Sequence, residues 1–322
     1  IDPKGSPLLM ASLAVLVSFL SASQDVVADA WRTDTLPPEE RGFGSATFVM
    51  GYRFGLLAAG GLALFIAQFH GWPQAYWSMA ALMSVGVVAT LAAREPDGHA
   101  PRTFVDAVAL PFREYFLRDG ALLALAFLVL YKLGDAIAGG MTTPFFLKLG
   151  FTKAEIAAIA KMFGMLASLG GGLLGGVLMV KLGMRRSLYV FGALQALTNL
   201  TFLVLALAGK STPLLTLAIC ADNLCGGMAT TAFVAFIMSL CNKRFSATQY
   251  ALLSALGTLG GRVLSGSSGF LAERLGWAGF FGLTVVLAIP ALILLAFLPQ
   301  DIATPTQEPT EPAPAPAPSA AR

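Results

Sequence analysis

The sequence is poor in charged residues, in histidine and in cysteine, and each scarcity argues against a class of protein. Charged residues make up 12% of the 322 residues, whereas soluble domains carry about 25%. A chain with so little charge cannot coat a water-exposed surface, which disfavours a soluble enzyme, a disordered protein and a nucleic-acid-binding domain. The formal net charge of +3 is also too small to indicate an anionic macromolecular partner, so we expect no nucleic acid.

The few cysteines and histidines form no recognisable chemical motif. Cys220, Cys225 and Cys241 show no Cys-x-x-Cys spacing and are interpreted as small apolar packing residues. His70 and His99 lie in or beside expected loops, and the sequence contains no metalloprotease, serine-hydrolase or P-loop motif. We therefore expect no catalytic residue, no metal site, no cofactor and no enzymatic activity.

Apolar residues are abundant, at 56% of the chain, and they occur in long runs. A helix needs about 20 mostly apolar residues to cross a bilayer. Nine stretches meet this requirement: 7–30, 43–68, 74–93, 121–147, 155–182, 187–208, 212–240, 246–272 and 277–298. The predicted fold class is an all-α polytopic membrane protein with nine transmembrane helices.

Basic residues are distributed unequally between the two sets of loops. If the C-terminus is cytoplasmic, eleven lysines and arginines face the cytoplasm and five face the opposite side. Cytoplasmic loops are normally enriched in these residues. We therefore predict a multi-pass membrane protein whose C-terminus is cytoplasmic.

The predicted helices divide into two groups around a long connection. Residues 1–93 hold three helices of an N-terminal lobe, and residues 121–298 hold six helices of a C-terminal lobe. The connection 94–120 mixes aromatic and charged residues, which indicates a short interfacial helix acting either as a tether or as a regulatory element. Residues 299–322 are rich in proline and alanine and are predicted to be a disordered tail.

A repeated pattern relates the two lobes. Ser-Ala-Thr opens predicted helices at Ser45 and at Ser246, and Gly-Trp follows those helices at Gly71 and at Gly276. Parallel repeats of helical units are a common build of secondary transporters.

Polar and ionisable side chains lie within the predicted membrane helices. Such residues are costly in a bilayer and by default mark a path for a substrate or an ion. Asp25 and Asp29 are four residues apart, and Lys132 and Asp135 are three apart, so each pair shares one helix face. The set of candidate site residues comprises Ser23, Gln24, Asp25, Asp29, Tyr52, Arg53, Lys132, Asp135, Lys161, Gln195, Asn199, Asp222, Asn223 and Arg262.

Two interpretations of these residues stay open. They line a hydrated cavity in which cations bind an anionic solute and a carboxylate carries a proton, or they form buried ion pairs that hold helices together. The second interpretation is stronger for Asp29, because Arg32 follows it by three residues, so Asp25 ranks above Asp29 for proton transfer. The glycines crowded into 155–182 and 246–272 leave a similar choice between static close packing and sliding helices.

The segment from Gly176 to Arg186 resembles the loop signature G-x-x-x-D-[RK]-x-G-x-[RK]-[RK] of the major facilitator superfamily. Val180 stands where that signature carries its acid. The resemblance implies a gating loop that contains Gly176, Lys181, Gly183, Arg185 and Arg186.

Four longer sequence motifs narrow the resemblance to one group of transporters. They are Ser21-Ala-Ser-Gln-Asp25, Leu130-Tyr-Lys-Leu-Gly-Asp-Ala136, Asn223-Leu-Cys-Gly-Gly-Met228 and Phe245-Ser-Ala-Thr-Gln-Tyr250. Together they resemble the AmpG-type muropeptide permeases. That family has twelve core helices, so the resemblance implies that the nine helices predicted here correspond to helices four to twelve of a larger transporter.

The resemblance also implies a function. AmpG-type permeases import anhydromuropeptides (N-acetylglucosamine–anhydro-N-acetylmuramyl peptides) across the bacterial inner membrane with protons, for peptidoglycan recycling and with a link to β-lactamase induction. Asp25 and Asp29 would then couple protons and the other candidate residues would bind substrate. The implied partners are this substrate, protons and the lipid bilayer, and the implied state is a monomer. Two alternatives remain: a facilitator-family transporter of another anionic or amphiphilic solute, and a non-transporting membrane scaffold or sensor.

Overall fold

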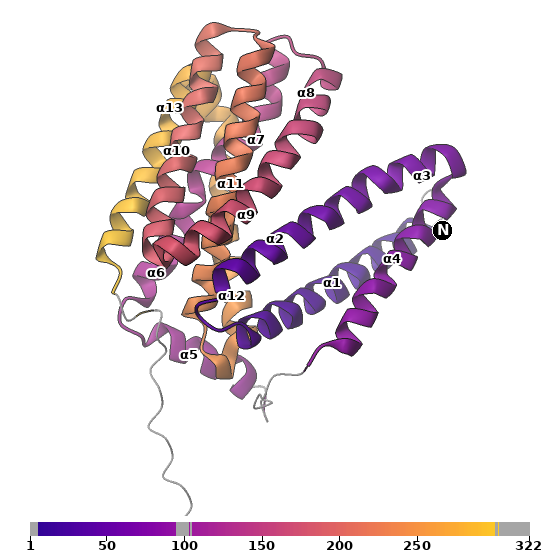
Figure 1. Ribbon diagram of the computed structural model, residues 1–322, viewed down its shortest axis with the longest axis vertical. Coiled ribbons are helices and arrows are strands. Elements are labelled where there is room, and N and C mark those ends of the chain that lie inside the picture. Colours follow the sequence, from indigo (N-terminus) through magenta and orange to yellow (C-terminus); the bar gives the residue numbers. More distant parts are fainter. Residues whose placement is uncertain (1–5, 95–102, 104, 300–301, 303–322) are drawn as a thin grey trace, which may run out of the picture.

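The structure is a computed structural model that describes residues 6–94, 103, 105–299 and 302 (Figure 1). Every element assigned within these residues is helical. The α-helices are α1 (Pro7–Thr35), α2 (Arg41–Leu57), α3 (Ala63–His70), α4 (Trp72–Ala92), α5 (Leu110–Phe116), α6 (Ala121–Tyr131), α7 (Leu133–Lys148), α8 (Lys153–Ile159), α9 (Met165–Leu182), α10 (Met184–Ala208), α11 (Thr212–Leu240), α12 (Ser246–Ser265) and α13 (Ser268–Phe297). Short π-helical segments η1 (Ala58–Leu62), η2 (Val105–Ala109) and η3 (Ala160–Gly164), and a 3₁₀ turn η4 (Lys243–Phe245), complete the order.

Two predicted segments fall partly outside the described residues. Of the predicted tail 299–322, only positions 299 and 302 are described. The predicted connection 94–120 lacks positions 95–102 and 104, and its remainder contains η2 and α5. The described part of this connection thus contains one α-helix, α5, and its placement at a membrane interface stays a prediction.

Eight helical segments within the described residues are long and apolar enough to cross a membrane. Two of these segments each join three elements into one continuous rod. One consists of α2, η1 and α3, and the other consists of α8, η3 and α9. The predicted stretch 246–272 is divided between α12, which ends at Ser265, and the start of α13. Helix α12 is not one of the eight, since polar residues such as Gln249 and Arg262 lower its mean hydropathy. The structure confirms an all-helical membrane protein and does not confirm the count of nine.

Single glycines turn the chain between successive helices. Gly71 separates α3 from α4 with φ 89° and ψ 166°, and Gly183 separates α9 from α10 with φ 78° and ψ 163°. Gly276 interrupts α13 with nearly the same angles, φ 67° and ψ 169°. Residues with a Cβ rarely adopt such positive φ values. The two Gly-Trp words of the sequence therefore mark the same backbone turn in the two halves of the chain.

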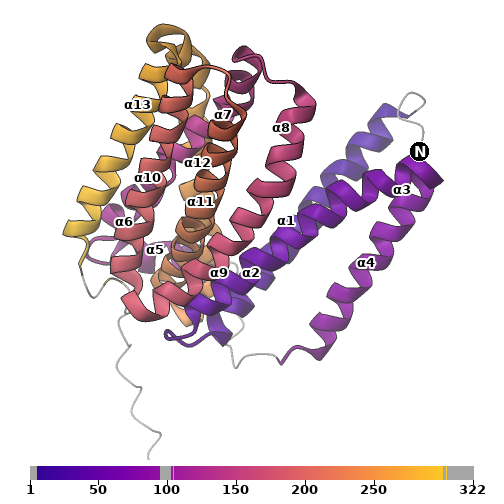
Figure 2. The same ribbon diagram turned by 45° about the horizontal axis from the view of Figure 1, so that its top comes forward.

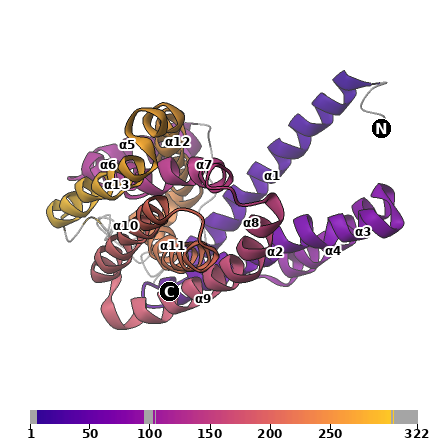
Figure 3. The same ribbon diagram turned by 90° about the horizontal axis from the view of Figure 1, so that it is seen from above.

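The helices form a compact bundle and a separate splayed group. Helices α6 to α13 lie together, whereas α1 to α4 extend away from them (Figures 1 and 2). The two groups meet at the end of the molecule that carries α5, and they diverge toward α3 and α8 (Figure 1). Seen from above, α1 and the pair α3 and α4 point outward from the bundle (Figure 3).

The apolar core lies inside the α6–α13 bundle. One cluster stacks aromatic rings of α7, α10 and α13, including Phe145, Phe146, Phe202 and Phe281. The ring centroids of Phe145 and Phe281 are 4.8 Å apart, an edge-to-face contact of the kind that aromatic pairs favour. This cluster fixes the helices that carry the cavity residues described below.

Glycines bring α9 and α11 into backbone contact. An added Cβ at Gly227 would lie 2.5 Å from the carbonyl oxygen of Ser168, and one at Gly175 would lie 2.8 Å from the Cα of Met228. At Gly171 an added Cβ would meet the carbonyl of Leu224. Small residues at such positions allow membrane helices to approach closely.

Candidate functional site

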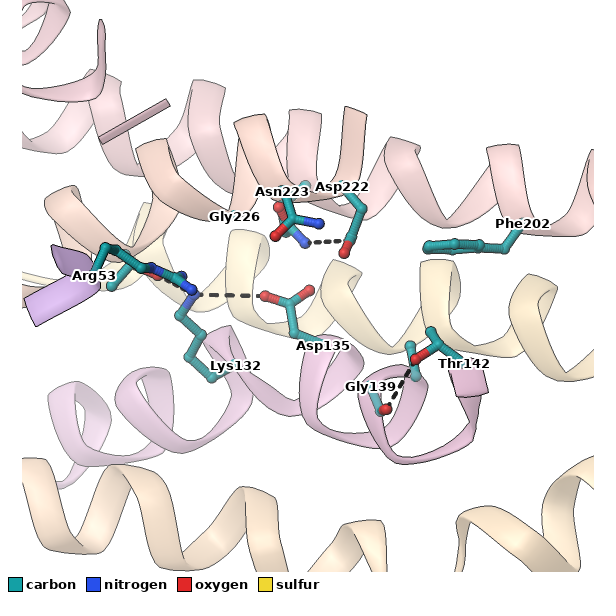
Figure 4. Close-up of a pocket in the computed structure, with 12 residues that line it drawn as sticks. Arg53, Lys132, Asp135, Gly139, Thr142, Phe202, Asp222, Asn223 and Gly226 are labelled. Carbon is teal, nitrogen blue, oxygen red and sulfur yellow. Dashed lines mark hydrogen bonds and ion pairs between the residues drawn. The ribbon is translucent and has the colours of Figure 1, made fainter. Parts of the chain in front are cut away.

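A polar cavity of about 180 Å³ lies between the splayed group and the bundle (Figure 4). Its walls come from α2, α7, α10 and α11 and from Lys132, which separates α6 from α7. The lining residues are Arg53, Lys132, Asp135, Ala138, Gly139, Thr142, Gln195, Phe202, Asp222, Asn223, Gly226 and Thr230.

A break in the helix places Lys132 in the cavity. Lys132 has φ −100° and ψ 0°, so it ends α6 and precedes α7. Its Nζ lies 3.5 Å from Oδ2 of Asp135 and donates a hydrogen bond of 3.1 Å to Oγ1 of Thr230. Broken helices that line polar cavities are typical binding elements of transporters. The expected pairing of Lys132 with Asp135 is present, and the same pair faces the cavity.

Neutral donors hold a second carboxylate. Oδ1 of Asp222 accepts a hydrogen bond of 3.0 Å from Nε2 of Gln195 and a longer one of 3.4 Å from Oγ1 of Thr198. The hydroxyl oxygen of Thr198 also lies 2.7 Å from the carbonyl oxygen of Gln195, so its single hydrogen is donated to one of these two acceptors at a time. Figure 4 shows the carboxylates of Asp135 and Asp222 directed into the same space.

Arg53 is the cavity residue contributed by the splayed group. Its side chain comes from α2 and is half-buried, and its Nε has no hydrogen-bond partner among the described residues. A guanidinium offers five N–H donors, so it has donors left for a bound group. The cavity thus combines two cations and two carboxylates, and one cation belongs to a different helix group from the other three charges.

Six of the predicted site residues meet at the cavity: Arg53, Lys132, Asp135, Gln195, Asp222 and Asn223. Others do not. Asn199 is buried in α10 and is 2% exposed, and Tyr52 and Arg262 are exposed on α2 and α12. The side chain of Lys161, on η3, falls outside the part of the chain that the structure describes.

The polar residues at the middle of α1 also lie away from the cavity. Asp25 is exposed, and the hydroxyl of Ser23 donates to the carbonyl of Phe19 within the helix. Gln24 faces a groove against Gly86 and Thr90 of α4. These side chains are therefore arranged around the α1–α4 group rather than around the bundle.

Sequence reasoning missed several cavity residues, among them Gly139, Thr142 and Thr230. Residues 135, 138, 139 and 142 of α7 follow the spacing of one helix face, as do residues 222, 223, 226 and 230 of α11. A search for polar and small residues in step with the charged ones would have found them.

Arg32 joins the two helix groups at the end near α5. It is 5% exposed, and its Nη2 lies 2.7 Å from Oδ1 of Asp29 and 2.7 Å from the hydroxyl oxygen of Tyr250 on α12. Its guanidinium carbon lies 3.8 Å from the ring centre of Phe48, a cation–π contact. Nearby, Ser246 donates to Asp34 at 2.8 Å. Asp29 is thus engaged in an ion pair, as the second interpretation expected.

Close backbone contact between α2 and α9 supports the same junction. An added Cβ at Gly176 would lie 2.7 Å from the Cβ of Ala46 and 3.1 Å from the carbonyl oxygen of Gly42. The first glycine of the predicted gating loop therefore serves the contact between the two groups.

The other residues of the predicted gating loop follow Gly176 at the end of α9. Gly183 makes the turn to α10, and Arg185 donates to the carbonyls of Leu295 (2.9 Å) and Ala296 (2.8 Å) at the end of α13. Lys181 and Arg186 are exposed. Cationic side chains stabilise the last carbonyls of a helix, so Arg185 anchors α13 to this loop.

Helix α5 is docked on the start of α12 by side-chain hydrogen bonds. Arg118 binds Glu114 at 2.6 Å and the carbonyl of Leu240 at 2.6 Å. Gln249 donates to Glu114 and accepts from the backbone N–H of Asn242 at 2.7 Å. These bonds hold the helix that carries Tyr250, the partner of Arg32.

Comparison with known proteins agrees with this architecture. Residues 4–265 match the Major Facilitator Superfamily. The chain is 47% identical over 297 residues to the anhydromuropeptide permease of Escherichia coli K12, which covers 91% of this chain and 60% of that relative. It is 37% identical over 295 residues to the putative transporter AmpG 4 of Rickettsia conorii, which covers 89% of this chain and 71% of the relative.

The putative transporter AmpG 4 of Rickettsia felis is 36% identical over 310 residues. The chain spans about 60% of the length of its Escherichia coli relative. The resemblance found in the sequence motifs is therefore confirmed, and the helices and the relatives indicate a multi-pass membrane protein. The chain belongs to the major facilitator superfamily and, within it, to the AmpG-type permeases.

Proposed function

We propose that the protein containing this chain imports anhydromuropeptides from the periplasm to the cytoplasm together with protons. The observation that carries the proposal is the cavity that joins Arg53 of one helix group to Lys132, Asp135 and Asp222 of the other. Charged groups in a membrane are costly, and their convergence on one space indicates a solute path. The Escherichia coli relative bears the name anhydromuropeptide permease.

The chemistry of the cavity suits an anionic, hydrogen-bonding solute. Lys132 and Arg53 are the cations for substrate carboxylates, and Asn223, Thr142 and Thr230 offer hydrogen bonds to sugar hydroxyls and amides. We place the protein in the bacterial inner membrane as a monomer, in peptidoglycan recycling with its link to β-lactamase induction.

The orientation of the proposed cycle follows from the loops. With the C-terminus in the cytoplasm, the end that carries α5 and the Arg32 contacts is the cytoplasmic end. The helix groups meet there and diverge at the other end (Figure 1). The described arrangement then corresponds to a state open toward the periplasm, and import requires the Arg32 contacts to separate.

Uptake of labelled anhydromuropeptide tests the proposal. Cells that lack their own permease receive the native gene, and uptake is measured with and without a protonophore. We expect Lys132→Ala to reduce uptake about tenfold or more, since a hydrogen bond to a charged group contributes about 1.5–3 kcal/mol. Lys148→Ala, exposed near the end of the same helix, is the matched control and should keep wild-type uptake.

Each alternative has its own signature in this experiment. Accumulation of another anionic solute, without uptake of the muropeptide, would identify a transporter of that solute. Unchanged β-lactam-inducible signalling in both lysine variants, with no uptake in the wild type, would identify a scaffold or sensor. Uptake that persists undiminished with the protonophore would remove proton coupling.

A further inference from the structure

The two carboxylates of the cavity have different partners. Asp135 lies 3.5 Å from the ammonium of Lys132, and that ammonium also donates to Thr230. Asp222 takes part in no ion pair recorded among the described residues, and its two recorded donors, Gln195 and Thr198, are neutral. Asp222 can therefore gain or lose a proton without breaking an ion pair, whereas Asp135 cannot.

The charges that face Asp222 come from three places. Asp135 lies on α7, Lys132 at the break before α7, and Arg53 on α2, and all three line the same cavity. Helix α10 contributes the neutral Gln195 and Thr198. The ionisable side chains Lys181 of α9 and Arg262 of α12 do not line it, and the side chain of Lys161 on η3 lies outside the described residues.

Gln195 has an amide oxygen without a partner. The residue is 7% exposed, and its Oε1 is buried and makes no hydrogen bond with any described residue, while its Nε2 donates to Asp222. Buried polar atoms are normally paired, and an orphaned one needs an explanation. An amide carries a donor and an acceptor at its end, so half a turn about its last side-chain bond would present Oε1 to Asp222 instead of Nε2.

Gly226 leaves space for that rotation. An added Cβ at Gly226 would lie 3.4 Å from Oε1 and 3.8 Å from Nε2 of Gln195. Both distances are ordinary van der Waals separations, so α11 does not crowd the amide of Gln195 at this position. The geometry permits the amide to donate to a carboxylate and, after rotation, to accept from a carboxylic acid.

We propose that Asp222 is a proton-binding group of the transport cycle and that Gln195 is its positioning residue, serving both protonation states by rotation of its amide. This inference rests on the proposed function. It assigns the transported proton to a residue of the bundle, in addition to the α1 carboxylates Asp25 and Asp29 that the sequence suggested. A proton from water binds an oxygen of Asp222, and the new O–H donates to Oε1 of Gln195. On release the proton returns to water, and Nε2 donates again.

Proton binding changes the charge of the cavity. Arg53 and Lys132 balance Asp135 and Asp222 when both acids are ionised. Once Asp222 is neutral, the described cavity residues carry one excess positive charge, which favours an anionic solute. Protonation of Asp222 therefore raises the affinity of the cavity for an anionic substrate. Loss of the proton lowers that affinity and favours release of the substrate.

Infrared difference spectroscopy of the purified, reconstituted protein tests the assignment without any substrate. A pH step should produce the C=O stretching band of a carboxylic acid in the wild type, and Asp222→Asn should lose that band. Glu273→Gln, an exposed carboxylate of α13, is the matched control and should retain it. A band unchanged by Asp222→Asn would overturn the proposal whether or not the protein transports muropeptides.

The role of Gln195 has a separate signature. Gln195→Leu removes both the donor and the acceptor, so the band of Asp222 should shift in frequency, whereas Gln68→Leu, exposed on α3, should leave it in place. A band that keeps its wild-type frequency in Gln195→Leu would overturn the positioning role. If Asp222→Asn does not yield folded protein, Asp222→Glu should keep a band at an altered frequency, and a wild-type frequency there would contradict the assignment.

Uptake then separates this inference from the proposed function. If the wild type imports labelled anhydromuropeptide, Asp222→Asn should abolish accumulation driven by an imposed pH gradient and still exchange labelled for unlabelled substrate. Gradient-driven accumulation at the wild-type level in Asp222→Asn would refute its role in coupling while leaving the import function intact.

Discussion

The α6–α13 bundle and the α1–α4 group bury very different shares of their apolar residues. In α11, 67% of the most apolar stretch is buried, whereas the corresponding share is 0% in α1 and 6% in both the α2–α3 rod and α4. The bundle is held by an aromatic core and glycine-mediated helix contacts. The splayed group meets it through Arg32 and a short stretch of small residues.

The difference indicates which part of the molecule would stay rigid in the proposed transport cycle. A close-packed core is costly to disturb, so the bundle keeps Lys132, Asp135 and Asp222 in fixed relation. The junction consists of α2 packed on α9 and α11 and of α1 packed on α12, and it is this interface that the proposed transport cycle requires to separate. In that cycle Arg53 would move relative to the other three charges.

The largest effect is expected inside the bundle. Gly171→Leu drives a side chain into the backbone of Leu224, which cannot move aside as a side chain can, so the cost should exceed that of ordinary overpacking, which is about 1–3 kcal/mol. We expect loss of monodisperse protein in size-exclusion chromatography. Gly170→Leu is the matched control, since the nearest atom to its added Cβ is 4.0 Å away. If Gly171→Leu and Gly170→Leu eluted alike, the close contact between Gly171 and the backbone of Leu224 would be contradicted.

The next effect is expected at the junction. Arg32→Ala leaves the partly buried Asp29 without its cation, and a hydrogen bond to a charged group contributes about 1.5–3 kcal/mol. The loss falls on the contact between the groups, so the bundle should stay folded while the end near α5 opens. Cys241, which is 2% exposed, is a native reporter there.

Thiol labelling measures that opening. Burial raises the pKa of the Cys241 thiol to about 12, and Arg118 and Arg41 offset only part of the shift. Because only the thiolate reacts, labelling near pH 8 should be slow in the wild type. Exposure returns the thiol toward its ordinary pKa of about 8.5, so labelling should accelerate in Arg32→Ala. Arg113→Ala, exposed on α5, is the control, and equal rates in both variants would count against the Arg32 contact.

The smallest effect is expected where α2 meets α9. Gly176→Val presses a side chain against Ala46 and Gly42 and should weaken the junction by about 1–3 kcal/mol. Cys241 labelling should rise less than in Arg32→Ala. Gly55→Val, whose added Cβ meets nothing within 4 Å, should label as the wild type does. Faster labelling in Gly55→Val would show that the α2–α9 contact is not what closes this end.

Local properties of the chain could be predicted from the sequence, because they depend on neighbouring residues. Runs of apolar residues specify membrane helices, and most predicted boundaries lie within a few residues of those observed. The Lys132–Asp135 pair follows from its spacing of three residues, and the Asp29–Arg32 pair likewise. The sequence motifs that resemble those of the AmpG-type permeases were sufficient to assign the chain to its family.

The site depended on contacts between distant segments, which spacing cannot supply. Gln24, Asp25 and Asp222 are all polar residues inside predicted helices, yet only Asp222 lies in the cavity. The break at Lys132 was also unexpected, since the run 121–147 is continuous in hydropathy.

The sequence by itself determined an all-helical membrane protein of a known family, because hydropathy and local motifs are read along one chain. Tertiary structure alone decided that Arg53 faces Lys132 across two helix groups, that Gln195 holds Asp222, and that Arg32 reaches Tyr250. The physical reason is helix rotation. Each helix has a polar face, but packing against its neighbours decides whether that face meets a cavity, another helix or the lipid.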